Sequence, residues 1–388
     1  MEFSFTDEQT MIFDTAEAFL GEVAEMASIR KSMETGLGYD PSAWDRLCQE
    51  MYWQAILIPE DNEGLGLGAV EVVGILERMG KKLYNGPFAS SAAVTLALAK
   101  WGSSDQKSAY FARLMSGESA TIAVIDQARA WSAEAVSAHA LQTDEGLRIS
   151  GKYRFVQHGH TANLILVAAR MPGTSGAEGI GLFLIDADAE GVIRNRVPTM
   201  DQTRPLAEVQ LESVLVQPEQ CIGCVGNSAQ ALTQLLDVQA ILITAEQLGG
   251  AQASLDMTVD YLQDRVQFGR TIASFQAVKH KCADMMLKVE ASRSIVYYAA
   301  CVIDEWLAGR YDANQLAEAA SMAKAYSSDA FFFVAGCGIQ LFGGVGITEE
   351  YDIQLYFKRA NATKRYLGDS AWHRERIAAL LLDGEALA

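Results

Sequence analysis

The segment VQAILITAEQLGGAQASLDMTVDYLQDRVQFGRTIASFQ, which runs from Val238 to Gln276, carries the strongest structural signal in this chain. In its second half, apolar residues recur at steps of four, three and four, at Leu255, Val259, Leu262 and Val266. This spacing places them on one face of an amphipathic helix. Gly269 follows shortly afterwards, and glycine commonly ends a helix. The segment therefore predicts a long helix followed by a turn.

The first half of this segment contains one ionisable side chain, that of Glu246. It stands among large apolar residues: Ile241, Leu242, Ile243 and Leu248. A buried carboxylate without a partner has a raised pKa and is a better general base, so Glu246 is a candidate catalytic residue. The alternative is a carboxylate that is satisfied by hydrogen bonds and only holds helices together. This feature alone favours neither interpretation.

Two motifs in the C-terminal half resemble segments of a known family. The first is RVQFGRTIASFQ at 265–276, and the second is QLFGGVG at 340–346, followed by Glu350 and Tyr351. Their order and spacing are similar to those of the acyl-CoA dehydrogenase family, and weaker similarity extends from Phe5 to the C-terminus. Taken alone, an arginine beside a glycine at a helix end is weak evidence for phosphate binding, because most such arginines form surface salt bridges.

The residue periodicity divides the chain into three blocks. Helical spacing begins with a capping box at Thr6, gives way to a period of two after about Thr121, and returns after about Asn227. Ser150-Gly151 predicts a turn within the middle block. Together with the resemblance, these blocks predict an α+β multidomain fold. Its parts are an N-terminal helical domain (1–120), a middle antiparallel β domain (121–226) and a C-terminal four-helix bundle (227–388), with helices near 228–264, 273–308, 312–342 and 349–365.

The resemblance implies flavin adenine dinucleotide (FAD) as cofactor, bound at a dimer interface. Arg265 and Phe268 would then contact the pyrophosphate and adenine side of the FAD of the neighbouring subunit, and Gln340 and Gly344 its adenosine portion. A guanidinium group neutralises phosphate, and glycine lets backbone N–H groups approach it closely. The alternative for the glycines around 344 is a tight turn between helices.

The middle block is less similar to the family. The segment GKYRFVQHG at 151–159 resembles the strand that passes the flavin, with Phe155 and Gln157 at the aromatic and hydrogen-bonding positions. A solvent-facing glutamine is the alternative for Gln157. The family's Thr-Glu-Pro and Gly-Ser-Asp loop is missing, because the corresponding region reads AVIDQARAWS at 123–132.

The implied reaction is α,β-desaturation of an acyl-CoA thioester, in which a carboxylate removes the α proton and the flavin accepts the β hydrogen as hydride. The two family positions for that base fall on Leu367 and Gln239 here, and neither is an acid. Glu246 lies seven residues after Gln239, on the same helical face but roughly 10 Å further along the axis. We predict Glu246 as the base. Asp369 is a second candidate, although it more plainly caps the next helix.

Composition limits the remaining classes of function. The net charge of -18 argues against nucleic-acid and anionic-membrane partners, because both would be repelled. The six cysteines suggest reduced structural thiols, the five histidines suggest no metal site, and the segment from Val238 is too polar to span a membrane. The N-terminus lacks the features of a signal peptide, so a cytoplasmic protein is expected.

Two functions fit the sequence. The first is an FAD-dependent acyl-CoA dehydrogenase with Glu246 as base, assembled as a homodimer or homotetramer and passing electrons to an electron-transfer flavoprotein. The second is a non-catalytic subunit of an α2β2 heterotetramer that completes the FAD site of a sister chain, which the lost base positions favour. Oxidase chemistry is a third possibility that nothing in the sequence selects. The divergence suggests a fatty acid or a bulky acyl group, such as a steroid side chain, as substrate.

Overall fold

A computed structural model describes residues 4–125 and 130–383. The chain forms two compact units, each built from segments that are distant in sequence. The helical unit comprises Met1–Glu34, Ala69–Tyr84 and Ala240–Glu385, and the sheet unit comprises Thr35–Gly68 and Asn85–Gln239. The order of helices, strands and helices along the chain is as predicted. The predicted domain limits remain a prediction, although the first strand begins at Ala120 and the helix after the sheet begins at Ala229.

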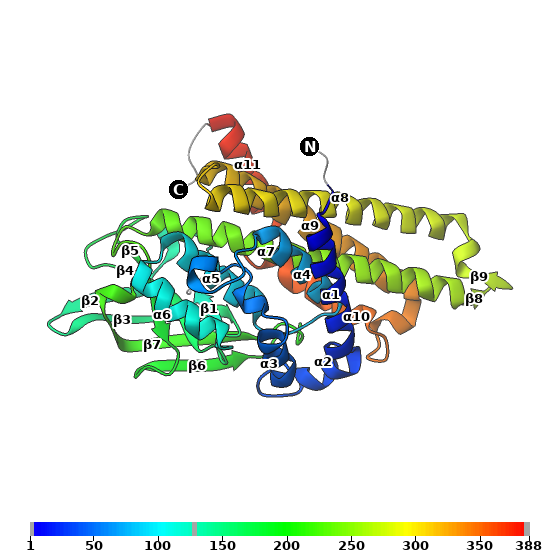
Figure 1. Cartoon of the computed structure of the whole chain (residues 1–388). Coiled ribbons are helices and arrows are strands. Elements are labelled where there is room, and N and C mark those ends of the chain that lie inside the picture. The colour runs from blue at the N-terminus through cyan, green and yellow to red at the C-terminus, as the bar shows by residue number, and fades with distance from the viewer. Residues whose placement is uncertain (1–3, 126–129, 384–388) are drawn as a thin grey trace. The chain divides into compact units, whose positions relative to one another are not determined.

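The helical unit contains long helices that Figure 1 shows running alongside one another. Its helices are α1 (Asp7–Val23), α2 (Met26–Met33), α4 (Ala69–Lys81), α7 (Ala229–Asp264, from Ala240 onward), α8 (Gln276–Leu307), α9 (Ala313–Phe342), α10 (Ile353–Arg365) and α11 (Ser370–Ala378). Short helical turns follow at η5 (Ile272–Ser274), η6 (Gly343–Ile347) and η7 (Ala379–Asp383), and a small hairpin consists of β8 (Val266–Gln267) and β9 (Arg270–Thr271). The predicted capping box at Thr6 is confirmed, since Thr6 and Gln9 bond each other's backbone N–H.

Glycines allow α4 and α7 to cross at backbone contact. A Cβ added to Gly80 would lie 2.1 Å from the carbonyl oxygen of Glu246, and one added to Gly249 would lie 1.7 Å from that of Glu77. No larger side chain fits at either point without moving a backbone. On the other side of α7, Gln247 donates to Ser328 of α9 at 3.2 Å. The segment from Val238 is therefore the central helix of this unit.

The sheet unit combines a seven-stranded sheet with helices. The strands are β1 (Ala120–Ala123), β2 (His139–Thr143), β3 (Gly146–Gln157), β4 (Leu164–Arg170), β5 (Ile180–Asp186), β6 (Val192–Val197) and β7 (Leu206–Val216). Neighbouring strands in the sheet follow the order β1-β4-β2-β3-β7-β6, and β5 pairs with β4 outside this order. The helices are α3 (Pro41–Gln49), α5 (Phe88–Trp101) and α6 (Ser104–Met115), with short turns η1 (Trp53–Ala55), η2 (Glu60–Asn62), η3 (Ala133–Ala135) and η4 (Pro218–Gln220).

Two details of the predicted sheet were wrong. β1 pairs with β4 in parallel, so the sheet is not purely antiparallel. The turn predicted at Ser150-Gly151 lies inside β3, where the register against β7 shifts. Gly151 is needed there because a Cβ would lie 2.3 Å from the Cβ of Ala138. A glycine within a strand often marks such an irregularity rather than a chain reversal.

The structure describes one helix, α9, that is long and apolar enough to span a membrane, and 44% of its most apolar window is buried in the protein. It packs against α8, α10 and α11. The fully buried Lys324 and Ser328 lie near the middle of this helix. One helix of this kind is also what the core of a globular protein contains.

Candidate functional site

Arg265 and Phe268 lie on the hairpin that follows α7 and projects from the helical unit (Figure 1). Phe268 and Gly269 form its turn with φ values of 54° and 75°. Two-residue hairpin turns of this type need positive φ at both positions. For a phenylalanine this conformation costs about 1 kcal/mol. Phe268 is nevertheless 90% exposed, so its ring is available for a contact outside its own chain.

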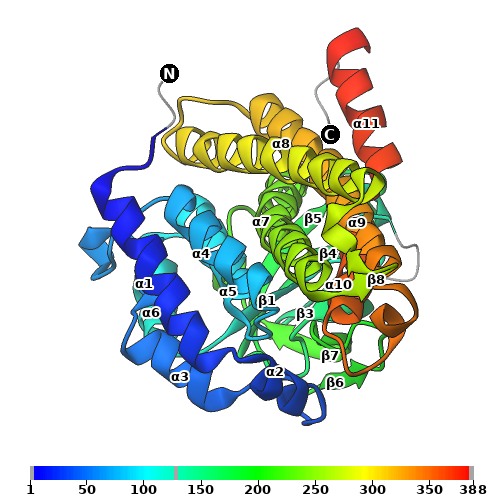
Figure 2. The ribbon, with the colours of Figure 1, turned by 90° about the vertical axis from the view of Figure 1, so that its right-hand side faces the viewer.

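Gln340 and Gly344 lie at the end of α9 in the same unit. The ring of Tyr261, near the end of α7, stacks on that of Phe342 with centroids 4.1 Å apart. This contact sets the ends of α7 and α9 side by side, so the structure brings the two predicted adenylate-binding motifs together. Figure 2 views this end of the unit head-on, with the hairpin beside the turn that follows α9.

This end of the helical unit fits the nucleotide half of a dinucleotide. The Arg265 side chain is exposed and can neutralise a phosphate. A Cβ added to Gly343 or Gly344 would meet no atom within 4 Å, so a ligand can reach the backbone there. The Arg270 guanidinium lies 3.9 Å from the ring centroid of Phe275, a cation–π contact that steadies the base of the hairpin.

Phe155 and Gln157 belong to the sheet unit and lie near the end of β3. Phe155 has a φ of 56° and is 36% exposed, at a register shift that turns its side chain out of the regular strand pattern. Gln157 is buried, so the alternative of a solvent-facing glutamine is wrong. Its Oε1 accepts a hydrogen bond from Nη2 of Arg204 at 2.6 Å. The loop at 123–132, which departs from the family pattern, lies partly outside the described residues, at 126–129.

Glu246 is buried, as predicted, and it has a charged partner. Nη1 of Arg359 on α10 lies 3.4 Å from Oε2 of Glu246, and both side chains are less than a tenth exposed. The two side chains form a buried ion pair between α7 and α10. The contact supports the second interpretation of Glu246, in which the carboxylate ties α7 to α10. Its role as base remains a prediction.

The loop after α10 holds Leu367, one of the two family positions for the base. Leu367 is buried and has a φ of 60°, and its carbonyl oxygen lies 2.8 Å from Nε2 of His373. The fully buried Lys324 of α9 donates to the carbonyl oxygens of Thr363 and Gly368, at 3.1 and 3.0 Å. A cation is favourable at the C-terminal end of a helix, which here is α10. The loop is thus firmly held, but a leucine cannot accept a proton.

The other candidates for the base have different surroundings. Asp369 caps α11, since its Oδ1 accepts from the backbone N–H of Trp372 at 2.9 Å. This is the structural role that the sequence favoured. Gln239, at the second family position, is partly buried on α7. Among the described residues, no carboxylate stands at either family position.

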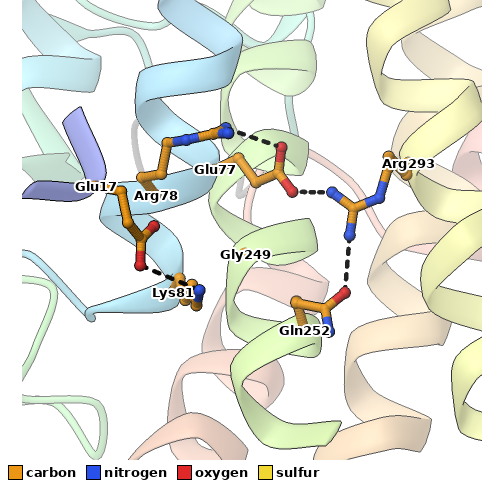
Figure 3. A pocket seen from close by; sticks show the side chains of 7 residues that line it. All are labelled: Glu17, Glu77, Arg78, Lys81, Gly249, Gln252 and Arg293. Carbon is orange, nitrogen blue, oxygen red and sulfur yellow. Dashed lines mark hydrogen bonds and ion pairs between the residues drawn. The ribbon is translucent and has the colours of Figure 1, made fainter. Parts of the chain in front are cut away.

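A polar cavity of about 170 Å³ lies in the helical unit between α1, α4, α7 and α8 (Figure 3). Glu77 is its central carboxylate and accepts from Tyr297 at 2.6 Å and from Arg293. Arg293 in turn donates to Gln252 of α7 at 2.8 Å. The lining charges are therefore already paired with one another, and this network links α4, α7 and α8.

Comparison with known proteins decides the family. Residues 6–118 and 229–382 match the acyl-CoA dehydrogenase N-terminal and C-terminal domains. The chain is 30% identical to acyl-CoA dehydrogenase IpdE2 of Mycolicibacterium smegmatis over 96% of its own length and 99% of that protein. The chain belongs to the acyl-CoA dehydrogenase family.

Solved structures of the family share its fold. Butyryl-CoA dehydrogenase from Megasphaera elsdenii superimposes with a TM-score of 0.86 at 25% identity, covering 98% of this chain and all of the other. A chain of the ChsE4-ChsE5 complex from Mycobacterium tuberculosis superimposes with a TM-score of 0.87 at 25% identity, and all of both chains is covered. As a member of this family, the chain is a flavin-dependent oxidoreductase that acts on acyl-CoA, alone or as a subunit.

Sequence reasoning missed three buried cations that contact the candidate residues or the loop at Leu367: Arg204, Lys324 and Arg359. Each is a buried cation whose partner is distant in sequence, so local periodicity gives no sign of the pairing. Arg359 could have been suspected, because its position on α10 falls on the face that also carries the buried Leu355 and Tyr356. In the described part of the chain, no group of three or more metal-ligating side chains could hold a metal ion.

Proposed function

We propose that this chain takes part in the FAD-dependent α,β-desaturation of an acyl-CoA thioester within an oligomer. The observation that supports it is the stacking of Tyr261 on Phe342, which sets the end of α7 before Arg265 beside the end of α9 before Gly344. In the family arrangement this end holds the adenylate half of the FAD of a neighbouring subunit, while Phe155 and Gln157 face the flavin of their own subunit.

The chemistry needs an acceptor for two electrons and a base for one proton. The flavin supplies the acceptor when it is bound, taking the β hydrogen as hydride at N5. The α proton passes to a carboxylate as the carbon–carbon double bond forms. Glu246 is the proposed base if this chain is catalytic, and its proton transfer would require the Arg359 contact to loosen. An electron-transfer flavoprotein is the proposed onward acceptor, and a cytoplasmic location is also proposed.

A second function is favoured by a specific observation. Leu367 occupies a firmly held loop at the usual base position, and Glu246 is paired with Arg359. Both features suit a subunit that contributes its FAD-binding end to a sister chain in an α2β2 assembly, where the sister chain supplies the base. A structure that superimposes on this chain is described as a complex of two components, ChsE4 and ChsE5. The acyl group is proposed to be a fatty acid or a bulky group such as a steroid side chain.

The visible absorbance spectrum of the purified chain tests the proposal. An oxidised-flavin spectrum from the chain expressed alone would indicate a complete homo-oligomeric site. A colourless chain that becomes yellow only when a sister subunit is coexpressed would indicate the composite site. A chain that binds no FAD in either case would overturn the proposal.

A further inference from the structure

Gln157 and Arg204 form a buried polar pair in the sheet unit. Arg204 lies in the loop between β6 and β7, and its Nη2 donates to Oε1 of Gln157 at 2.6 Å. Arg204 is 5% exposed and Gln157 is 6% exposed. A hydrogen bond from a charged donor is about twice as strong as one between neutral groups, and burial strengthens it further. The pair therefore fixes which end of the Gln157 amide faces the guanidinium.

The backbone around this pair is also held. The carbonyl oxygen of Gln157 accepts from Oγ1 of Thr121 on β1 at 2.5 Å. The N–H of His158 donates to the carbonyl oxygen of Pro205, the residue after Arg204, at 3.0 Å. Gln157 and Leu206 are paired in the ladder between β3 and β7. With the backbone held, the remaining freedom of Gln157 is rotation about its side-chain bonds, and the hydrogen bond from Arg204 restricts it.

The consequence is a fixed hydrogen-bonding character. With Oε1 directed at Arg204, the group of Gln157 that remains for a ligand is the Nε2 amide, which can only donate. Within the described residues, nothing accepts a hydrogen bond from Nε2. A glutamine without such a partner could present either end, since its two ends differ only in which atom is the donor.

We infer that Arg204 is a positioning residue that makes Gln157 an obligate hydrogen-bond donor to the flavin ring. This rests on the proposed function, in which Gln157 faces the flavin. Oxidised flavin offers acceptors at N1, N5, O2 and O4 and a donor at N3–H. A donor-only amide pairs with the acceptor edge of the ring and not with N3–H. Arg204 does not touch the flavin and acts through the orientation of Gln157.

FAD labelled with ¹⁵N provides a direct readout of this orientation. The labelled FAD is bound to the protein, purified alone or with its sister subunit, and the ring nitrogens are followed by NMR together with the dissociation constant. Arg204→Met removes the guanidinium, and we expect a shifted N1 or N5 resonance and an FAD dissociation constant raised about tenfold, as for one lost hydrogen bond. Arg204→Lys keeps a charged donor to Oε1 and is expected to restore the wild-type spectrum.

A second variant covers the case in which Arg204→Met fails to fold. Gln157→Glu keeps a partner for Arg204 but replaces the donor with an acceptor, and we expect it to weaken FAD binding about tenfold or more and to shift the same resonance. Unchanged resonances of all the ring nitrogens in flavin-loaded Arg204→Met, or wild-type FAD binding by Gln157→Glu, would each overturn the inference. A wild-type protein that binds no FAD, alone or with a sister chain, would overturn the proposed function itself and the inference with it.

Discussion

At the scale of single residues, the pairing of Glu246 with Arg359 decides how the catalytic role is tested. A general base must reach the substrate and take up its proton, whereas a carboxylate that ties α7 to α10 must keep its contact with the Arg359 guanidinium. The catalytic role and the structural role of Glu246 predict different results for Glu246→Gln, which removes the charge of the side chain and keeps its shape.

Glu246→Gln should leave FAD bound and abolish bleaching of the flavin by an acyl-CoA substrate if Glu246 is the base. Glutamine keeps the size of the side chain and cannot remove the α proton. The measurement is the loss of absorbance near 450 nm after anaerobic substrate addition. Unchanged bleaching would move the base elsewhere and leave Glu246 with its structural role.

Arg359→Gln is the companion variant, because it removes the partner and leaves Glu246 in place. Removing the guanidinium from beside this buried carboxylate is expected to cost about 3–5 kcal/mol of folding free energy. Urea unfolding of Glu246→Gln and Arg359→Gln at pH 7, each compared with the wild type, measures this cost in folding free energy. A cost below about 1 kcal/mol for Arg359→Gln would show that Glu246 does not depend on this pair.

The buried His373 should make the folding stability of the protein depend on pH. Burial, and next the charge of Lys324, lowers the pKa of His373 from its ordinary value of 6.5 to about 3. The unfolded chain therefore binds a proton below pH 6.5 that the folded protein does not, and stability falls with decreasing pH by roughly 1.4 kcal/mol per pH unit. His373→Gln should remove this contribution, seen as a flatter dependence of the unfolding free energy between pH 4.5 and 6.5.

A second group, Asp304, also makes the folding stability depend on pH. The stability curve of His373→Gln must therefore be compared with that of the wild type. Burial raises the pKa of this carboxyl to about 6, so its contribution to stability falls as pH rises from about 4 to 6. This opposes the His373 effect in the wild type, but it is present equally in His373→Gln. Parallel stability curves for the two proteins would show that His373 does not supply the acid sensitivity.

At the scale of elements, the crossing of α4 and α7 depends on the two glycines at backbone contact. Gly249→Ala would place a Cβ 1.7 Å from the carbonyl oxygen of Glu77, so the helices must separate. We expect a loss of at least 1–3 kcal/mol, the usual cost of overpacking, measured by chemical denaturation. Gly21→Ala in α1 is the matched control, because its Cβ would meet no atom within 4 Å. Helix propensity predicts a gain of up to about 1 kcal/mol there.

The elements also show what sequence can predict. The helices expected at 228–264, 312–342 and 349–365 are close to α7, α9 and α10, because each has a long apolar repeat and a clear end signal. Gly151 was misassigned because a glycine that permits close approach within a strand has the same local signature as one that permits a turn. The same limit applies to Gln157, whose burial depends on Arg204, a residue 47 positions away.

At the scale of the whole molecule, the two halves of the proposed FAD site lie in different units of the chain, and the family arrangement takes them from different subunits. Arg265→Ala should abolish FAD retention by removing the phosphate contact, without loss of stability, because the side chain is exposed. Arg310→Ala, which removes an exposed arginine paired with Glu305, is the control and should retain FAD.

Complementation then distinguishes a shared site from a site within one chain. A mixed dimer of Arg265→Ala and Gln157→Leu chains has one site built from two intact halves and one built from two altered halves, if the halves come from different subunits. At an FAD concentration close to the wild-type dissociation constant, it should therefore hold about half of the wild-type FAD, which is more than either homodimer holds. If each chain formed its own site, every site would carry one alteration and the mixture would bind no more FAD than the separate variants. The ratio of 450 nm absorbance to protein in the co-purified dimer, isolated through two different affinity tags, measures the outcome. For a chain that assembles only with a sister subunit, the same logic holds with Arg265→Ala in this chain, which should empty the FAD site of the sister.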